Sequence, residues 1–220
     1  MAYNKDMNRG PIITGEYYHV FNHGVERNNI FETQTEFSRF LLGMKLFNSK
    51  EPISSIREYF ENGKNNDKKI TDVHLVDIVA YCLNPNHYHM LLKQVSDGGI
   101  AEFMKRLNGA YTWYFNATNK RKGALFRGKY KSKHISDNDY LLHVSAYVNL
   151  NNLVHNLSGR TAVKSSWGEY VGGKVGLCEK SIILEQFNSP KEYEKFALGS
   201  LELSLERKKE EKDLAALLIE

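Results

Sequence analysis

The chain has little of what marks secreted or membrane proteins. Its 220 residues contain two cysteines, Cys82 and Cys178, which lie far apart and form neither a zinc-ligand pair nor a disulfide framework. No run of about 18 apolar residues, the length that a membrane span requires, is present. The polar N-terminal residues also lack the apolar stretch of a signal peptide. These absences predict a cytoplasmic protein without a membrane anchor.

Other common signals are missing too. There is no Gly-x-x-x-x-Gly-Lys-Ser/Thr loop, so nothing indicates nucleotide hydrolysis of the kind that uses this loop. Internal repeats and low-complexity tracts are absent. At 41% hydrophobic residues, the chain can bury one sizeable core with an appended piece. The net charge of +4 is too small to indicate a partner on its own.

Acidic residues are missing from the segment between Phe103 and His134, where aromatic residues alternate with basic ones. The basic residues of this segment are Lys105, Arg106, Lys120, Arg121, Lys122, Arg127, Lys129, Lys131 and Lys133. Single-stranded nucleic acid binds to such surfaces through cations at its phosphates and rings stacked on its bases. We therefore predict that these nine residues bind nucleic acid. The alternative is a solvated edge strand that its lysines protect from aggregation.

Hydrophobic periodicity predicts an alternating series of strands and helices. The expected order is strand 16–22, helix 36–47, strands 73–82 and 87–95, helix 100–114, strand 124–135 and helix 140–150. This order is typical of an α+β, ferredoxin-like fold: a four-stranded antiparallel sheet with helices on one face. In strand 124–135, four of the basic residues would share one face. We expect a mobile loop at 61–69, one domain over 1–158, and a helical C-terminal extension, 159–220, packed on the core.

Two histidines open the expected strand after the turn residues Asn84-Pro85-Asn86. His87 and His89 are two positions apart, so their side chains point to the same face of a strand. Two imidazoles placed in this way can share a metal ion. The alternative is a pair of ordinary histidines at the start of a strand.

A tyrosine on the last expected helix is the third feature. Tyr147 and Asn151 are four residues apart, which places them on one face of a helix that begins near Asp137. A tyrosine hydroxyl can attack a phosphodiester, although its ordinary pKa near 10 requires a cation or a base nearby. The amide oxygen of Asn151 can complete a metal site that His87 and His89 begin.

Together these features resemble the single-tyrosine HUH transposases, and among them the REP-associated tyrosine transposases. The resemblance rests on His87-Tyr-His89, on the segment Gly123-Ala-Leu-Phe-Arg-Gly-Lys-Tyr-Lys-Ser132, and on Tyr147-Val-Asn-Leu-Asn151. The opening segment Tyr18 to Phe31 and Ser165 to Tyr170 also resemble family segments, so the similarity extends over roughly residues 15–200. The sequence departs from the family pattern in three places: at His23, at Asn152, and at a loop near residue 65 that looks like an insertion.

The resemblance implies a metal-dependent single-stranded DNA endonuclease and strand transferase. His87 and His89 would hold Mg²⁺ or Mn²⁺, Asn151 would be a third ligand, and Tyr147 would form a 5′-phosphotyrosine. The implied partner is single-stranded or hairpin DNA, bound by a monomer or a homodimer. Two alternatives remain: an RNA-binding module on the same fold, and a domesticated transposase that binds a DNA hairpin without cutting it.

Overall fold

The fold is built on one antiparallel sheet. The computed structural model describes residues 11–51, 56, 73–155, 157 and 163–217, with the side chains of 207–217 left aside. The strands are β1 (Tyr17–His23), β2 (Val76–Asn84), β3 (His87–Gln94), β4 (Lys131–Ile135) and β5 (Lys164–Ser165). They lie in the order β4-β1-β3-β2-β5, and every neighbouring pair is antiparallel.

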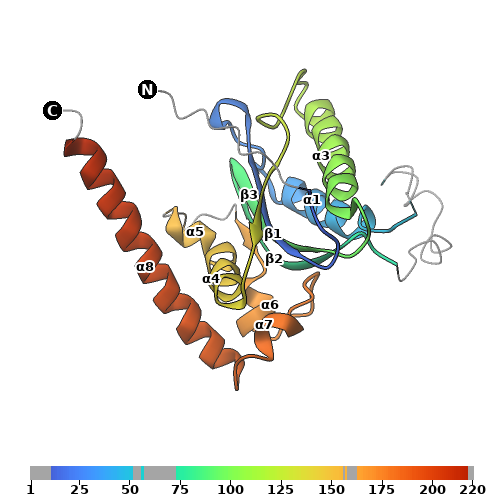
Figure 1. Ribbon diagram of the computed structural model, residues 1–220. Coiled ribbons are helices and arrows are strands. Elements are labelled where there is room, and N and C mark those ends of the chain that lie inside the picture. Colours follow the sequence, from blue (N-terminus) through green and yellow to red (C-terminus); the bar gives the residue numbers. More distant parts are fainter. Residues whose placement is uncertain (1–10, 52–55, 57–72, 156, 158–162, 218–220) are drawn as a thin grey trace.

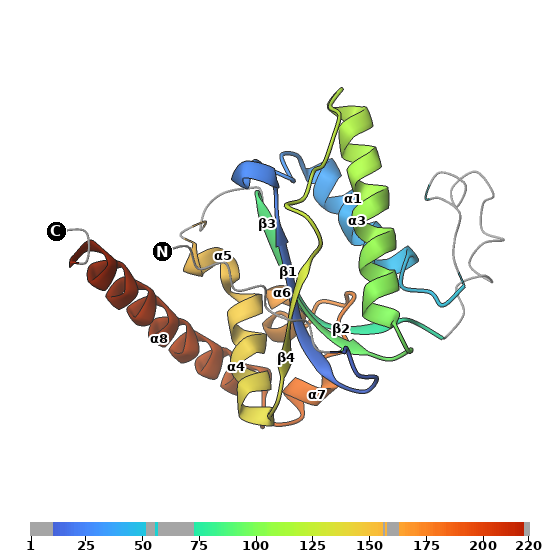
Figure 2. The same ribbon diagram turned by 45° about the horizontal axis from the view of Figure 1, so that its top comes forward.

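Helices cover both faces of the sheet. The helical segments are η1 (Val25–Arg27), α1 (Gln34–Leu46), α3 (Gly99–Thr118), α4 (Asn138–Asn149), α5 (Asn151–Val154), α6 (Trp167–Val171), α7 (Ser181–Leu184) and α8 (Pro190–Leu217). Helices α1 and α3 lie on one face, and α4 with α8 lies on the other (Figures 1 and 2). No described helix is long and apolar enough to cross a membrane.

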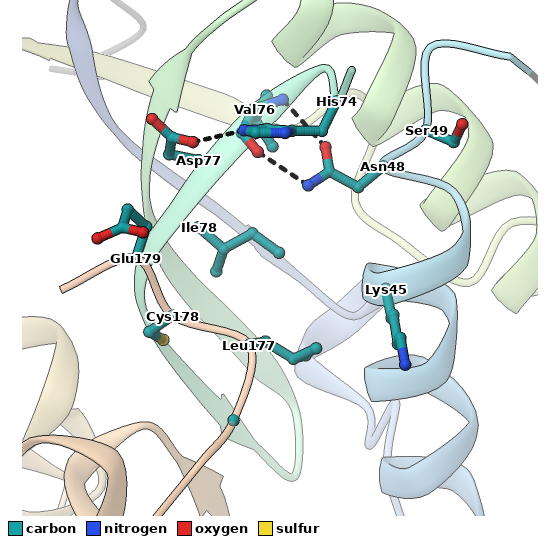
Figure 3. A pocket seen from close by; sticks show the side chains of 11 residues that line it. Lys45, Asn48, Ser49, His74, Val76, Asp77, Ile78, Leu177, Cys178 and Glu179 are labelled. Carbon is teal, nitrogen blue, oxygen red and sulfur yellow. Dashed lines mark hydrogen bonds and ion pairs between the residues drawn. The ribbon is translucent and has the colours of Figure 1, made fainter. Parts of the chain in front are cut away.

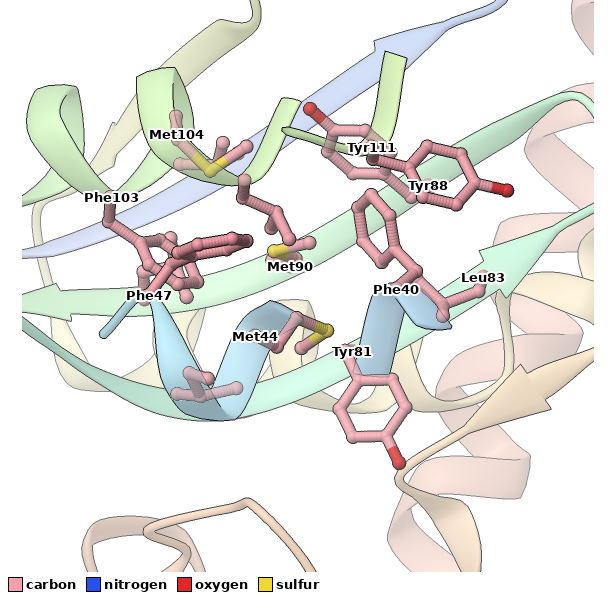
Figure 4. Close-up of a cluster of buried hydrophobic side chains, with 14 of the residues drawn as sticks. Phe40, Met44, Phe47, Tyr81, Leu83, Tyr88, Met90, Phe103, Met104 and Tyr111 are labelled. Atoms are coloured by element: carbon pink, nitrogen blue, oxygen red, sulfur yellow. The ribbon is translucent and has the colours of Figure 1, made fainter. Parts of the chain in front are cut away.

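The main core fills the space between the sheet and the pair α1 and α3. Figure 4 shows Phe40 and Met44 of α1 packed against Tyr88 and Met90 of β3 and Tyr111 of α3. All five side chains are buried. Because alternate residues of a strand point to opposite faces, the same β3 residues that fill this core leave their neighbours facing α4. The alternation therefore places His87 and His89 on the face opposite this core.

A β-bulge in β2 changes which residues face α4. Val76 and Ile78 belong to the core under α1 and α3, yet so do Tyr81 and Leu83. The register shifts between Ile78 and Ala80, which adds one residue to β2 relative to β3. After this shift the even-numbered residues of β2 face α4. Asn84, at the end of β2, is consequently the direct partner of His87 on β3.

Helix α4 begins as its sequence predicts. The Asp137 side chain accepts a hydrogen bond from the Tyr140 backbone N–H at 2.8 Å and caps the helix N-terminus. At Leu150 the backbone leaves helical geometry (φ −107°, ψ 15°), and α5 continues from Asn151. The two short helices thus place Tyr147 and Asn151 on either side of a break.

The C-terminal helix α8 packs against α4. The Tyr193 hydroxyl on α8 accepts a hydrogen bond from Asn149 Nδ2 at 2.9 Å, and His143 Nδ1 pairs with Ser200 Oγ at 2.9 Å. Tyr193 and Ala197 are fully buried in a second core beneath the α4 face. The described part of the C-terminal segment is therefore fixed to the side of the sheet that carries the histidines.

The α+β class and the expected strands and helices are confirmed, with two corrections. First, the sheet has a fifth strand, the two-residue β5 at the edge of β2. Second, the expected strand 124–135 is regular only from Lys131, because the chain turns at Gly128, where φ is +71°. That conformation is accessible to glycine at little cost and ends an extended run. The loop expected at 61–69 lies outside the described residues, and the division at residue 158 stays a prediction.

Candidate metal and nucleophile site

Three neighbouring strands bring polar side chains together under α4. His87 and His89 lie on β3, and the residues paired with them on β2 are Asn84 and Cys82. Both histidines and Asn84 are buried. The structure therefore keeps the two histidines on one face, as their spacing predicts, and adds an asparagine beside them.

The protonation of His87 is fixed by its neighbour. His87 Nδ1 lies 2.7 Å from Asn86 Oδ1, which can only accept a hydrogen bond, so Nδ1 carries the proton. Nε2 is then an unprotonated nitrogen, and it accepts a hydrogen bond from Asn84 Nδ2 at 2.9 Å. Asn151 Oδ1, another acceptor, lies 3.1 Å from the same nitrogen.

His89 is held by a histidine on β1. His89 Nδ1 and His19 Nε2 are 2.8 Å apart, so one of these nitrogens donates to the other. Burial, and then the charges of His19 and His87, lower the pKa of His89 well below its ordinary value. Burial and Lys133 lower the pKa of His19 to about 4. Both rings are therefore neutral at pH 7, and Nε2 of His89 is the nitrogen left for a metal ion.

Asn151 lies beside His87 and is itself fully buried. Its Oδ1 accepts a hydrogen bond from Asn84 Nδ2 at 2.8 Å, while its Nδ2 is the only buried side-chain nitrogen or oxygen of the described residues without a hydrogen-bond partner. Burying an unpaired amide costs about 1–3 kcal/mol. Such a cost is typical of functional sites, where a ligand changes the surroundings of the group.

Tyr147 lies over the histidines. Its ring meets the rings of His89 and His19 edge-on, with centroids 5.6 and 5.8 Å apart. Burial raises the pKa of Tyr147 above its ordinary value, and the adjacent Asn151 amide opposes this rise. A phenol with a raised pKa is a weak nucleophile, so this tyrosine needs positive charge close by in order to react.

The donor atoms fit a divalent metal ion. His87 Nε2 and Asn151 Oδ1 both present lone pairs, and they lie 3.1 Å apart with no proton between them. A neutral His89 adds a second imidazole on the same face. Imidazole nitrogen and amide oxygen suit Mn²⁺ and Mg²⁺ as well as zinc or nickel. The three residues predicted as ligands are thus brought together with Tyr147, and their role stays a prediction.

The sequence interpretation missed His155. The ligand nitrogens of His87, His89 and His155 all lie within 4.8 Å of one another, and the rings of His87 and His155 are 4.7 Å apart. His155 is exposed and caps the C-terminus of α5. The signal was available, since His155 follows Asn151 by four residues, one helical turn. His19 and Asn86 were missed as well, because their part is to orient other residues.

The site opens into a cavity of about 1090 Å³ that includes His19, His89, Tyr147 and His155 in its walls. Ser200 of α8 also lines it. His89 and Tyr147 are both reached from this cavity.

Basic residues of β4 flank this cavity. Lys131 pairs with Phe21 and Lys133 with His19, so both lysines lie on the face that carries the histidines. Lys133 lines the cavity and lies 4.9 Å from the centre of the Tyr140 ring. The interpretation that Arg127, Lys129, Lys131 and Lys133 share one strand face is wrong for the first two. Those two precede β4, on the turn at Gly128.

The other basic residues lie elsewhere. Lys105 and Arg106 belong to α3, on the opposite face of the sheet from α4 (Figure 1). Arg106 is also engaged, donating to Glu102 Oε1 and to the Ser49 carbonyl, each at 2.7 Å. The group Lys120, Arg121 and Lys122 follows the C-terminus of α3. The structure thus gathers only the β4 part of the predicted stripe at the site, and the DNA-binding role of all nine stays a prediction.

A second cavity of about 390 Å³ lies between α1, β2 and the segment that precedes α7. Figure 3 shows His74 and Asp77 in its wall, joined by a 2.6 Å ion pair, and Asn48 bonded to the backbone of β2. None of the residues predicted as a ligand, nucleophile or nucleic-acid contact lines it. Its polar groups bond to one another and to β2, so they hold α1 to the sheet.

Comparison with protein families gives one match. Residues 47–151 match the family model described as "Transposase IS200 like". The matched segment includes β2, β3, α3, β4 and α4, and it ends at Asn151. His87, His89 and Tyr147 lie within it. The resemblance to tyrosine transposases noted from the sequence is confirmed by this match.

Two solved structures resemble the chain. The first is a REP-associated tyrosine transposase bound to a REP hairpin, with a TM-score of 0.46 and 13% identity over 74% of this chain and 84% of that one. The second is a candidate transposase from Deinococcus radiodurans R1, with a TM-score of 0.36 and 15% identity over 68% of this chain and 97% of that one. No curated protein sequence matches the chain.

Proposed function

We propose that this chain, whose residues 47–151 match the IS200-like transposase family, is a metal-dependent endonuclease and strand transferase for single-stranded DNA. One observation carries the proposal. The unprotonated His87 Nε2 meets Asn151 Oδ1 at 3.1 Å, and the Tyr147 ring lies 5.6 Å from that of His89 in the same cavity. This arrangement supports a site in which one phosphodiester reaches both a cation and the Tyr147 phenol.

His87, His89 and Asn151 are the residues that would hold Mg²⁺ or Mn²⁺. Such an ion, when bound, acts as a Lewis acid on the scissile phosphate and neutralises the charge that develops there. His19 and Asn86 keep the two imidazoles in place through bonds of 2.8 and 2.7 Å. The family resemblance supports the choice of magnesium or manganese, since the ligand types alone also suit other metals.

Tyr147 is the proposed nucleophile. Its phenol oxygen bonds to phosphorus while the bond to the 3′ oxygen breaks, and the phenolic proton is balanced by the hydroxyl that forms on the leaving strand. The products are a 5′-phosphotyrosine and a free 3′-hydroxyl. Because the phosphotyrosine keeps the energy of the original bond, the 3′-hydroxyl of another strand can reverse the step without nucleotide hydrolysis. This reversal joins two DNA ends.

The proposed DNA partner is single-stranded or hairpin-forming. Lys131 and Lys133 support this, since both lie on the site face of the edge strand and are exposed. Single strands bind to grooves with cations for the backbone and rings for the bases. Phe21 and Tyr140 of the cavity wall offer such rings.

The test is a covalent-adduct assay. The protein is incubated with hairpin-bearing single-stranded DNA and Mn²⁺, and a denaturing gel resolves a protein–DNA species. We expect an adduct with the wild type and none with Tyr147→Phe, which removes one oxygen and keeps the ring. Tyr140→Phe is the matched control, because it loses the same atom on the same helix within the same cavity.

An adduct that persists in Tyr147→Phe would remove this tyrosine from the proposal. A wild-type protein that binds the hairpin tightly without forming an adduct would instead support the domesticated, non-cutting alternative.

A further inference from the structure

Asn84 is a polar side chain of the site that the sequence interpretation treats only as a turn residue and that the proposed mechanism does not use. It is fully buried at the end of β2, directly opposite His87. Its Nδ2 donates to His87 Nε2 at 2.9 Å and to Asn151 Oδ1 at 2.8 Å. These two acceptors are the atoms proposed to bind the metal. The Asn84 amide group therefore occupies both lone pairs that a metal ion would need.

The three atoms form a nearly regular triangle. The edges are 2.8 Å between Asn84 Nδ2 and Asn151 Oδ1, 2.9 Å between Asn84 Nδ2 and His87 Nε2, and 3.1 Å between His87 Nε2 and Asn151 Oδ1. In an octahedral Mg²⁺ site with ligands at 2.0–2.1 Å, neighbouring ligand atoms are about 2.9–3.0 Å apart. The triangle thus has the dimensions of one face of such a site, with Asn84 at its third corner.

We infer that Asn84 is itself a metal ligand, reached by a half-turn of its side-chain amide. The half-turn exchanges Nδ2 for Oδ1 at nearly the same position, because the two ends of an amide differ little in size. The N–H donor that faces His87 and Asn151 is thereby replaced by an oxygen, whose lone pair can bind a metal ion. The proposed function is presupposed, since the inference adds a ligand to the site made by His87, His89 and Asn151.

The surroundings of Asn84 accommodate both orientations. Its Oδ1 now lies 3.7 Å from Cys82 Sγ, which donates to it. A thiol is both a weak donor and a weak acceptor, so it can pair with either end of the amide. After the half-turn, the amide nitrogen faces this sulfur and donates to it. Neither orientation leaves the far end of the amide without a partner.

The β2 bulge is what brings Asn84 to the site. Before the bulge, even-numbered residues such as Val76 and Ile78 point to the core under α1 and α3. The register shift between Ile78 and Ala80 turns the later even-numbered residues to the opposite face. Without the extra residue, Asn84 would point away from His87. The β2 bulge is therefore what places Asn84 where it can act as a metal ligand.

Mn²⁺ calorimetry without DNA tests the inference. We expect Asn84→Ala to weaken Mn²⁺ binding by roughly tenfold or more, as loss of a supporting group commonly does. Asn84→Asp should bind Mn²⁺ more tightly than the wild type, because a carboxylate oxygen is a stronger ligand than an amide oxygen. Asn22→Asp is the matched control, since Asn22 is also buried in the sheet but pairs with Tyr88, on the face opposite the histidines.

The outcomes are separable. Unchanged or tighter binding in Asn84→Ala would mean that the amide only competes with the metal, and the inference would fail while the proposed function stands. If circular dichroism shows that Asn84→Ala does not fold, Asn84→Asp decides the question. The inference is overturned if Asn84→Asp binds Mn²⁺ more weakly than the wild type, or if Asn22→Asp gains as much Mn²⁺ affinity as Asn84→Asp does. If His87→Ala binds Mn²⁺ like the wild type, the proposed metal site itself is wrong.

Discussion

The bond between His19 and His89 offers a sharp test of the metal site. His19 touches neither the proposed metal atoms nor the phosphate, yet its Nε2 lies 2.8 Å from His89 Nδ1. It holds the His89 ring so that the other nitrogen faces the cavity. The substitution His19→Leu introduces an apolar side chain of similar bulk and removes this bond. We expect the His89 ring to lose its fixed orientation.

The expected magnitude follows from what outer partners of metal ligands contribute. Removing such a partner commonly costs 10–100-fold in metal affinity, which corresponds to about 1.4–2.8 kcal/mol. His89 would also keep a buried nitrogen without a partner, which costs about 1–3 kcal/mol in the free protein. We therefore expect His19→Leu to bind Mn²⁺ about 10–100 times more weakly and to unfold at a lower temperature.

Titration calorimetry with Mn²⁺ measures the first effect, and a thermal melt of the metal-free protein measures the second. His19→Gln should restore part of the affinity, because its amide can reach the same nitrogen. The control is His134→Leu on β4, where the histidine pairs with Glu16 at the surface. If His19→Leu binds Mn²⁺ as the wild type and the control do, His19 does not position His89, and the reasoning is refuted.

Two further predictions concern the DNA surface and the fold. Lys133→Ala should flatten the salt dependence of binding to single-stranded DNA by about 0.7 in the slope of log K against log salt, whereas Lys45→Ala on α1 should leave this slope unchanged. Equal slopes for the two variants would contradict the prediction that Lys133 contacts the DNA backbone. Gly99→Ala should lower the free energy of unfolding by roughly 1–3 kcal/mol, because the new Cβ would lie against the Leu75 carbonyl oxygen. Gly109→Ala, in open space on α3, should instead be neutral or stabilising by up to about 1 kcal/mol, and a chemical-denaturation series on both variants compares the two.

Much of the fold could be predicted because its signals are local. The Asp137 cap, the apolar spacing of α1 and α3, and the turn at Pro85 each depend on a few adjacent residues. The beginning of β4 was mispredicted although its cause is local as well. Gly128 adopts a positive φ there, and glycine in an extended-looking stretch fits both a strand and a turn.

The site could be predicted only in part because its remaining members are joined through space. His19 and His89 are 70 residues apart, and Asn84 and Asn151 are 67 apart. Asn84 and Asn86 were interpreted solely as turn residues, which they also are. The contact of Asn84 to His87 depends on the β2 bulge, and the position of Asn151 depends on the break at Leu150. Neither irregularity has a sequence pattern of its own.

The edge of β2 explains how this strand can change its side chains while the C-terminal segment stays attached to the sheet. Three of its bonds are made to β2 carbonyls: Glu179 N–H to Ile78 at 2.9 Å, the Tyr170 hydroxyl to Val79 at 2.8 Å, and Ser166 N–H to Tyr81 at 3.0 Å. A backbone carbonyl is the same whichever side chain its residue carries. Substitutions along β2 therefore leave these acceptors in place, so the strand can adapt its core and site residues over evolutionary time while the segment beside it stays attached.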